Sequence, residues 1–197
     1  MHKSLNFVWR LLIGSLVFLS AGCSAYSTST AEEPAATATT MEGEMLKLTS
    51  PAFANNSEMA NRYAYKMGSQ CNGENYSPAL QWEGVPSGTK SFTLTMIDPD
   101  GGNWVHWILV NLPPDINSLE EAIGGPEIAT AGRNSFGKNG YGGPCPPSGT
   151  HHYVFTLYAL DCPLDVKQGV TLKEVNSQMK GHILAQSEWI GLRSASK

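Results

Sequence analysis

The sequence predicts one β-rich domain with long ordered loops, and three observations lead to this fold class. Only 15% of the 197 residues are charged, whereas glycine (20 residues) and proline (12 residues) are abundant, as is usual in strand-and-turn proteins. Apolar stretches of strand length lie at residues 91–98, 104–112 and 153–160, with turn-forming residues between them. With 41% hydrophobic residues, the chain is long enough to bury one core.

The other expected elements are short. The pattern predicts brief strands at residues 45–48, 62–67 and 79–82, and one helical turn at residues 118–122. Residues 134–149 form a loop rich in glycine and proline. Ordered loops of this length are usually functional, so we expect this loop to belong to a binding site.

One helix is expected near the end of the chain. Thr171 and Glu174 have the spacing of a capping box, in which the two residues satisfy each other's backbone N–H groups. Apolar residues then recur at helical spacing, namely Leu172, Val175, Met179, Ile183 and Ile190. Gly181 interrupts this run and is expected to bend it. The pattern therefore predicts a C-terminal helix that packs on the sheet.

Polar residues stand at the ends of the three long strands. Because side chains alternate between the two faces of a strand, Asp98 ends the apolar row of the first strand. By the same alternation, His106 shares a face with Trp104, Ile108 and Val110 of the second strand. His151 shares a face with Tyr153 of the third. We expect these polar residues to meet in one shallow pocket, walled by Trp104 and the loop prolines: Asp98, His106, His151 and Tyr153.

The chemistry of this set suits a compact anion. Imidazole N–H groups, the Tyr153 hydroxyl and backbone N–H groups of the glycine-rich loop can all donate hydrogen bonds. Asp98 is expected to accept from a histidine N–H, which fixes the tautomer and raises the pKa of that ring. A cationic imidazolium would then face the ligand, and affinity would fall as pH rises through the histidine pKa.

The N-terminal region predicts export from the cytoplasm. Lys3 and Arg10 precede an apolar run, residues 11–19, that is too short to span a bilayer. Small residues then lead to Cys23, as in a bacterial lipoprotein signal. We therefore expect a signal peptide at 1–22, a lipid on Cys23, a flexible tether at 23–43 and a folded domain at 44–195, anchored in the cell envelope. An ordinary secretory signal cleaved nearby is the alternative.

The remaining cysteines leave two possibilities open. If Cys23 carries lipid, three cysteines remain, which is an odd number for an oxidising compartment. Cys71 and Cys145 both lie in glycine-rich loops beside the expected pocket, so a disulfide between them is the favoured pairing. Cys162 would then be free. The alternative is that all three thiols are reduced.

Four groups of residues form recognisable motifs in order along the chain. They are residues 75–82 (NYSPALQW), Asp98-Pro99-Asp100 with His106-Trp107, residues 143–147 (GPCPP) with His151-His152-Tyr153, and residues 181–185 (GHILA). Together they resemble the phosphatidylethanolamine-binding protein family, in its bacterial Raf-kinase-inhibitor-like (YbhB/YbcL) branch. The resemblance covers roughly residues 46–192.

The resemblance implies an all-β sandwich with a small pocket for phosphate, sulfate, acetate or a phosphoryl headgroup. Many relatives carry arginine where this chain has His152, whose side chain should point away from the pocket. A lipid anchor is also not general in the family. Carried over residue by residue, the implied ligand-binding set is Asp98, Trp104, His106, Pro147, His151 and Tyr153.

These observations favour a binding module without catalysis, which takes a small anion or phosphorylated headgroup and acts on a possible protein partner. The alternatives are an inhibitor of an extracytoplasmic hydrolase or protease, and a hydrolase that uses Asp98, His106 and His151. The sequence has no Gly-x-Ser-x-Gly nucleophile motif. Zinc held by the two histidines and Cys71 or Cys145 is a weaker variant, because no short-spaced ligand pair is present. No basic run is present, so no nucleic-acid partner is expected, and we expect no cofactor or metal.

Overall fold

The computed structural model describes residues 45–69, 71–125 and 127–196. The expected signal peptide (1–22), the lipidation site Cys23 and the tether (23–43) lie outside the described residues. Within the described part of the chain, no helix combines the length and the apolar character needed to cross a membrane.

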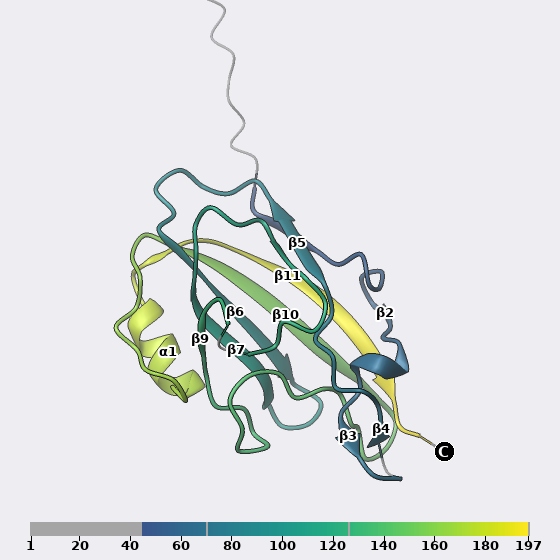
Figure 1. Cartoon of the computed structure of the whole chain (residues 1–197). Helices are drawn as coiled ribbons and strands as arrows, with labels where there is room; N and C mark the ends of the chain where they lie inside the picture. The colour runs from purple at the N-terminus through teal and green to yellow at the C-terminus, as the bar shows by residue number, and fades with distance from the viewer. Residues whose placement is uncertain (1–44, 70, 126, 197) are drawn as a thin grey trace, which may run out of the picture. The chain divides into compact units, whose positions relative to one another are not determined.

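A six-stranded sheet carries most of the domain, and long strands make up its centre (Figure 1). Its spatial order is β2 (Ser57–Glu58), β11 (Ile183–Ser194), β10 (Thr150–Leu160), β6 (Ser91–Asp98), β7 (Trp104–Leu112) and β9 (Thr130–Ala131). All neighbours are antiparallel except β11 and β2. The bounds of β6 and β7 agree with the sequence prediction, while β10 begins three residues before the expected start.

Smaller elements cover one face of this sheet. A three-stranded sheet has the order β1 (Lys47–Thr49), β5 (Leu80–Glu83) and β8 (Ser118–Leu119). A separate hairpin joins β3 (Lys66–Met67) to β4 (Cys71–Asn72), and a 3-10 turn, η1 (Asn61–Tyr63), precedes it. This hairpin lies near the end of the large sheet where β10 begins and β11 ends (Figure 1).

The main core lies between the two sheets, as the predicted sandwich requires. Alternate residues of β6, β7 and β10 point into it, among them Leu94, Trp107 and Phe155. Leu48 of β1 and Leu80 of β5 meet them from the small sheet, and all five side chains are buried. Burial of such side chains contributes about 1.5–3 kcal/mol each, so this core is the main source of stability.

The one α-helix within the described residues, α1 (Leu172–Met179), covers the other face of the large sheet. Its buried residues Val175 and Met179 share a second apolar cluster with Ile108 and Val110 of β7. The capping box is present as predicted, since the Thr171 side chain accepts from the Glu174 backbone N–H and the Glu174 carboxylate accepts from the Thr171 N–H. The prediction of a helix packed on the sheet is confirmed.

The expected continuation of this helix is wrong. The helix stops before Gly181, whose φ of +87° turns the chain back, and residues from Ile183 onward form the 12-residue strand β11. Ile183 and Ile190 fitted helical spacing only because intervals of four and seven residues also occur by chance in a strand. Pairing with β10 along almost its whole length decides the conformation of this segment.

Two shorter predictions are also wrong. Residues 118–122 contain strand β8, because Ser118 and Leu119 pair with the edge of β5, where a helical turn was expected. Residues 62–67 were expected to form one strand, but η1 occupies the first part and only β3 is extended. The buried Tyr63 explains the turn, since its ring enters the main core and its hydroxyl donates to Glu121 at 2.8 Å.

Candidate functional site

The predicted polar residues meet where β6 ends, β7 begins and β10 begins. The antiparallel register places these three strand ends side by side, with Asp98 directly opposite Trp104. A pocket with a volume of about 600 Å³ opens there. All six residues of the predicted set line it: Asp98, Trp104, His106, Pro147, His151 and Tyr153.

A buried carboxylate–imidazole pair forms one wall. Nδ1 of His151 lies 2.7 Å from Oδ2 of Asp98, and the two side chains are 13% and 6% exposed. The other carboxylate oxygen accepts from the backbone N–H of Gly101 at 2.8 Å. Because a carboxylate only accepts, Nδ1 of His151 carries the proton, which leaves Nε2 as the second ring nitrogen available to a ligand.

His106 enters the pocket through a β-bulge. Met96 and Ile97 of β6 oppose Trp107 and Val105 of β7, so His106 is one extra residue in the ladder. Strict alternation had placed His106 on the face of Ile108 and Val110, but those residues pack against α1 on the opposite side of the sheet. The expectation about this face is therefore wrong, and the bulge is the physical reason.

His106 is not the histidine that donates to Asp98, and its surroundings differ from those of His151. Its Nδ1 donates to the carbonyl of Gly142 at 2.6 Å, and the ring is only 3% exposed. Burial lowers the pKa of His106, although the Gly142 carbonyl and the charge of Asp98 act in the opposite direction. The ring is thus neutral near pH 7, and its Nε2 accepts a hydrogen bond.

Tyr153 is fully buried on the pocket wall. Its ring lies edge-on to the ring of His106, with 5.1 Å between centroids. Within the described residues, its hydroxyl makes no hydrogen bond of ordinary distance and angle, although the backbone N–H of Cys145 approaches its oxygen and acts to lower its pKa. The hydroxyl proton therefore has no acceptor there. Burial, and then the charge of Asp98, raise the pKa of Tyr153 above that of a free phenol, so the group stays protonated. Buried polar atoms without a partner are rare in folded proteins, so this hydroxyl calls for an explanation.

The mouth of the pocket is apolar. Trp104, 41% exposed, meets the edge of Phe136 at 5.5 Å between centroids, and Phe136 stacks on Tyr65 at 4.0 Å. Met67 of β3 and Pro147 also line the pocket. The cavity therefore combines polar groups on its inner wall with a broad apolar surface at its edge.

A disulfide and several hydrogen bonds hold the glycine-rich loop in place. Cys71 of β4 is bonded to Cys145 of the loop, 74 residues apart, which is the pairing favoured by the sequence. The Tyr65 N–H donates to the Pro144 carbonyl at 2.9 Å. A side chain at Gly143 would collide with the backbone of Tyr63, so only glycine fits there. The oxidised state of both cysteines excludes them as thiolate ligands of a zinc ion in the pocket.

The expected nest of backbone N–H groups is only partly available. The Gly142 N–H donates to the His106 carbonyl at 2.9 Å, and the Gly143 N–H donates to Asn75 at 2.8 Å. Pro144, Pro146 and Pro147 have no N–H. Most of this loop therefore serves to hold the pocket walls, and side chains supply the principal polar groups.

Sequence reasoning missed several residues that line the pocket: Met67, Asp100, Gly101, Phe136 and Ser148. Asp100 belongs to the Asp-Pro-Asp motif and accepts from both the backbone N–H and Nδ1 of His152, at 2.7 and 2.9 Å. The His152 side chain does not line the cavity. Phe136 lies in the loop that was expected to be functional, but nothing in its local sequence indicates which face it turns to the pocket.

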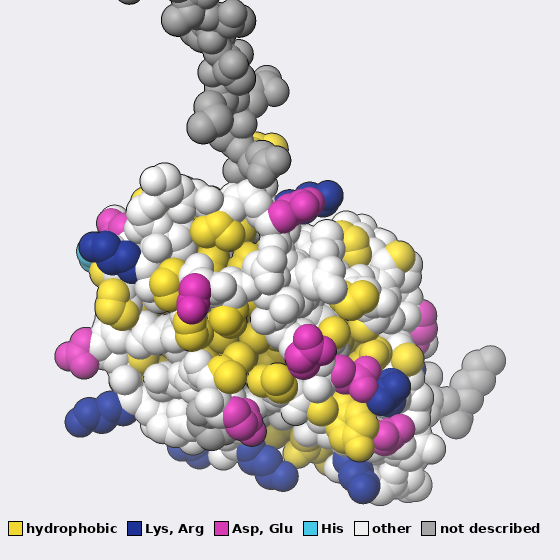
Figure 2. Space-filling model, turned by 45° about the horizontal axis from the view of Figure 1, so that its top comes forward, with side chains coloured by type: hydrophobic (Ala, Val, Ile, Leu, Met, Phe, Trp, Pro, Cys, Tyr) yellow, Lys and Arg dark blue, Asp and Glu magenta, His cyan; other side chains and the backbone are white. Residues whose placement is uncertain are grey.

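On the face drawn in Figure 2, lysine and arginine side chains do not gather into one positively charged patch. Hydrophobic side chains gather toward the middle of that face, while lysine and arginine lie mainly at its margins.

Comparisons with known proteins agree with this architecture. A family profile described as "Phosphatidylethanolamine-binding protein" matches residues 49–194. A UPF0098 protein of Methanothermobacter thermautotrophicus is 42% identical, over 75% of this chain and 97% of its own length. The UPF0098 protein YbhB of Escherichia coli is 39% identical, over 72% of this chain and 96% of its own.

Solved structures give the same result. The crystal structure of E. coli YbcL, described as a member of the mammalian PEBP family, superposes with a TM-score of 0.71 at 33% identity, covering 77% of this chain and 99% of YbcL. The phosphatidylethanolamine-binding protein homolog CT736 of Chlamydia trachomatis gives 0.70 at 36% identity, covering 78% and 99%. The motifs, the β-rich fold and these matches agree, and the chain belongs to the phosphatidylethanolamine-binding protein family.

Proposed function

We propose that the protein binds, without turnover, a phosphoryl or similar anionic group in the pocket of Asp98, His106, His151 and Tyr153. The observation that carries the proposal is the buried Tyr153 hydroxyl, whose proton lacks an acceptor within the described residues and which lies on the wall of a cavity of about 600 Å³. A ligand oxygen at this position would satisfy a donor that otherwise costs free energy to bury.

The two histidines have different roles in this proposal. His151 is oriented by Asp98, whose carboxylate accepts from Nδ1, so Nε2 of His151 is left to contact the ligand. His106 is held neutral by burial and offers Nε2 as an acceptor. Because the Tyr153 hydroxyl can donate and His106 can accept, the site suits a ligand that presents both an anionic oxygen and a proton donor, such as a singly protonated phosphoryl group or a headgroup with an ammonium.

The apolar mouth indicates that the anion is attached to an apolar group. Trp104, Phe136, Met67 and Pro147 offer surface that a free inorganic ion cannot use. A phospholipid headgroup with the start of its acyl region, or a small phosphorylated organic molecule, fits both parts of the cavity. Titration with the three ligands described below distinguishes a phospholipid from a small phosphorylated molecule.

A hydrolase is the second candidate, because Asp98 and His151 form a carboxylate–imidazole pair and Ser148 lines the same cavity. However, in the described residues no hydrogen bond joins Ser148 to His151, and Ser148 is exposed. The arrangement therefore lacks an activated nucleophile, which favours binding over catalysis.

The test compares Tyr153→Phe with the wild-type full chain by calorimetric titration. Inorganic phosphate, phosphorylethanolamine and a short-chain phosphatidylethanolamine serve as ligands. Loss of one hydrogen bond to a charged group costs about 1.5–3 kcal/mol, so affinity should fall about 10- to 100-fold for every ligand that binds. Tyr158→Phe removes a hydroxyl from the same strand outside the pocket and should change nothing.

Equal affinity in Tyr153→Phe and wild type would sink the proposed site. Tighter binding of the short-chain phospholipid than of its free headgroup would support the role of the apolar mouth. Release of a product from any of these ligands, lost in His151→Ala, would favour the hydrolase.

The proposal also includes a place of action outside the cytoplasm. It rests on the sequence of residues 1–23, with support from the Cys71–Cys145 disulfide, since such bonds persist mainly in oxidising compartments. Labelling of the full chain with a clickable fatty acid should mark Cys23. Equal labelling of wild type and Cys23→Ala would refute the lipid anchor.

A further inference from the structure

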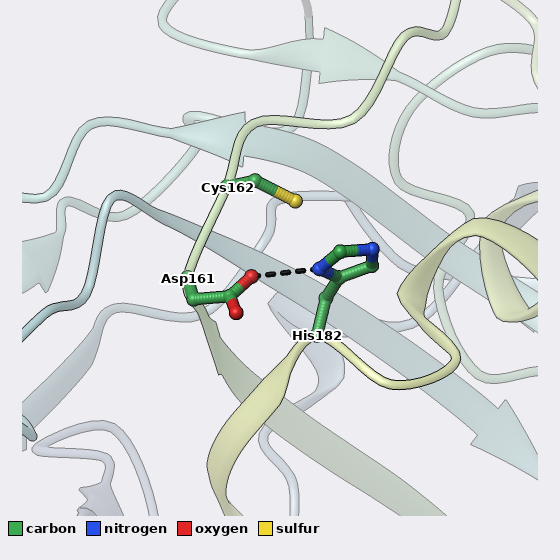
Figure 3. A group of neighbouring side chains, drawn as sticks. All are labelled: Asp161, Cys162 and His182. Carbon is green, nitrogen blue, oxygen red and sulfur yellow. Dashed lines mark hydrogen bonds and ion pairs between the residues drawn. The ribbon is translucent and has the colours of Figure 1, made fainter.

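Three side chains of different donor types converge at the far end of β10 from the pocket. Asp161 and Cys162 directly follow β10, and His182 directly precedes β11 (Figure 3). His151 and Asp161 are ten positions apart along β10, which corresponds to about 33 Å in an extended strand. The cluster is therefore separate from the pocket described above.

Backbone contacts hold the three residues in this arrangement. The Asp161 N–H donates to the His182 carbonyl at 3.1 Å, which continues the pairing of β10 and β11 past the last ladder pair. Ser91 donates its hydroxyl to the Cys162 carbonyl at 2.7 Å. The His182 N–H donates to the Met179 carbonyl at 3.0 Å, and the turn at Gly181 brings the chain back from α1. The side chains thus stand on fixed backbone.

The distances suit a small cation. One carboxylate oxygen, one thiol sulfur and one imidazole nitrogen lie within 4.8 Å of one another. One of these separations, 2.8 Å, joins Oδ1 of Asp161 to Nδ1 of His182. In a tetrahedral zinc site, metal–ligand bonds of about 2.0–2.3 Å put neighbouring ligand atoms about 3.3–3.8 Å apart. Small side-chain rotations would bring all three atoms to that separation.

The chemical types of the three ligand atoms indicate which ion would bind. A thiolate and an imidazole favour zinc and similar borderline ions over calcium and magnesium, which prefer oxygen ligands only. We propose that Asp161, Cys162 and His182 form a zinc site, with water in the fourth position. On binding, the Cys162 thiol gives its proton to solvent and the sulfur bonds the metal, while the ion replaces the Asp161–His182 hydrogen bond.

The accessibility of the cluster fits an exchangeable site. The side chains of Asp161 and His182 are 45% and 46% exposed, and Cys162 is the free cysteine among the described residues. Bound zinc would join the end of β10 to the start of β11, directly beside the loop that carries α1. It would therefore stabilise the folded chain in proportion to its occupancy.

The chain contains a matched control. His152 and Asp100 form a pair with nearly the same geometry, 2.9 Å, and nearly the same exposure, 51% and 43%. In the described residues this pair belongs to no cluster of three metal-ligating side chains. If zinc needed only an exposed His–Asp pair, both places would bind it.

The experiment measures zinc on the chelator-treated full chain by equilibrium dialysis and elemental analysis. Wild type and His152→Ala should each take up one zinc ion per chain at this site. Cys162→Ser and His182→Ala should bind it at least about 100-fold more weakly, since loss of an outer-shell partner alone costs 10- to 100-fold. Cobalt(II) should give a thiolate-to-metal absorption band in wild type and not in Cys162→Ser.

Circular dichroism of the metal-free variants provides the folding control: His182 is exposed, and Cys162→Ser changes one atom of a partly buried side chain, so both variants should fold. Zinc should raise the melting temperature of wild type and leave that of Cys162→Ser unchanged. Equal zinc uptake by wild type and Cys162→Ser, or no uptake by wild type above the buffer level, would overturn the proposal whether or not the anion pocket binds a ligand.

Discussion

The two ends of β10 carry the same chemical pair in different surroundings. At its start, His151 and Asp98 are 2.7 Å apart and almost buried. Just beyond its end, His182 and Asp161 are 2.8 Å apart and nearly half exposed. The distances are the same within 0.1 Å, so distance alone does not distinguish the two pairs. Burial does, because a buried ion pair cannot exchange its partner for water, whereas an exposed one can.

Removing the carboxylate of each pair should produce the largest difference in stability between the two ends of β10. Asp98→Ala leaves the largely buried His151 Nδ1–H without its acceptor and also removes the acceptor of the Gly101 N–H, which should lower the free energy of unfolding by about 3–5 kcal/mol. Asp161→Ala, measured in chelator, should leave the denaturation midpoint unchanged, because its partner turns to water. Urea titrations of both variants test this. Equal destabilisation would mean that burial is not what separates the two pairs.

The two ends of β10 also differ in their cross-links, because the Cys71–Cys145 disulfide holds only the pocket end. Removing this disulfide is the second test of the comparison. Replacing both Cys71 and Cys145 by serine removes a cross-link across 74 residues, which should cost about 2–4 kcal/mol. The substitution should also weaken ligand binding in the pocket, since the loop behind Pro147 loses its tie to β4. Zinc uptake at Cys162 should be unaffected. A change in zinc uptake would show that the two ends are coupled through β10.

The pH dependence of stability gives the smallest expected effect. The folded protein holds the pKa of His106 below its usual value of about 6.5, whereas the unfolded chain takes up a proton near that value. Protons therefore favour the unfolded state between the two pKa values. The contribution of His106 is fully present above about pH 6.5 and is lost as the pH falls toward the lower, folded pKa.

His106→Asn keeps a donor for the Gly142 carbonyl but cannot titrate. Its urea midpoint should therefore fall less steeply than that of wild type as the pH is lowered from 8 to 5. Parallel pH profiles for wild type and His106→Asn would contradict the lowered pKa.

Much of this molecule could be predicted from local sequence. The bounds of β6 and β7 follow from alternating apolar residues, and the start of α1 follows from the capping pair Thr171 and Glu174. Side-chain alternation and the positions of the strand ends also grouped Asp98, His106, His151 and Tyr153, whereas Pro147 was added only by the resemblance to a family. Apolar periodicity in a single strand could not have placed Pro147 beside Asp98.

The wrong predictions have a common cause: contacts between residues far apart in the sequence determine the structure at these positions. Residues after Gly181 have apolar spacing that fits a helix, but their partner is β10, more than 20 positions away at every pair of the ladder. The neutral state of His106 depends on burial and on the Gly142 carbonyl, and neither is visible near position 106. Local patterns cannot report such partners, so the fold class was predictable and the protonation of the pocket was not.

The bulge at His106 has a consequence for comparing this chain with its relatives. A bulge is an insertion, so the orientation of this ring depends on how many residues lie between Trp104 and Trp107 as well as on which residues they are. A relative with every pocket residue type but one position fewer there would turn its histidine toward the helix. Before a ligand preference is inferred from one such protein to another, their alignment should therefore be checked for a gap in this segment.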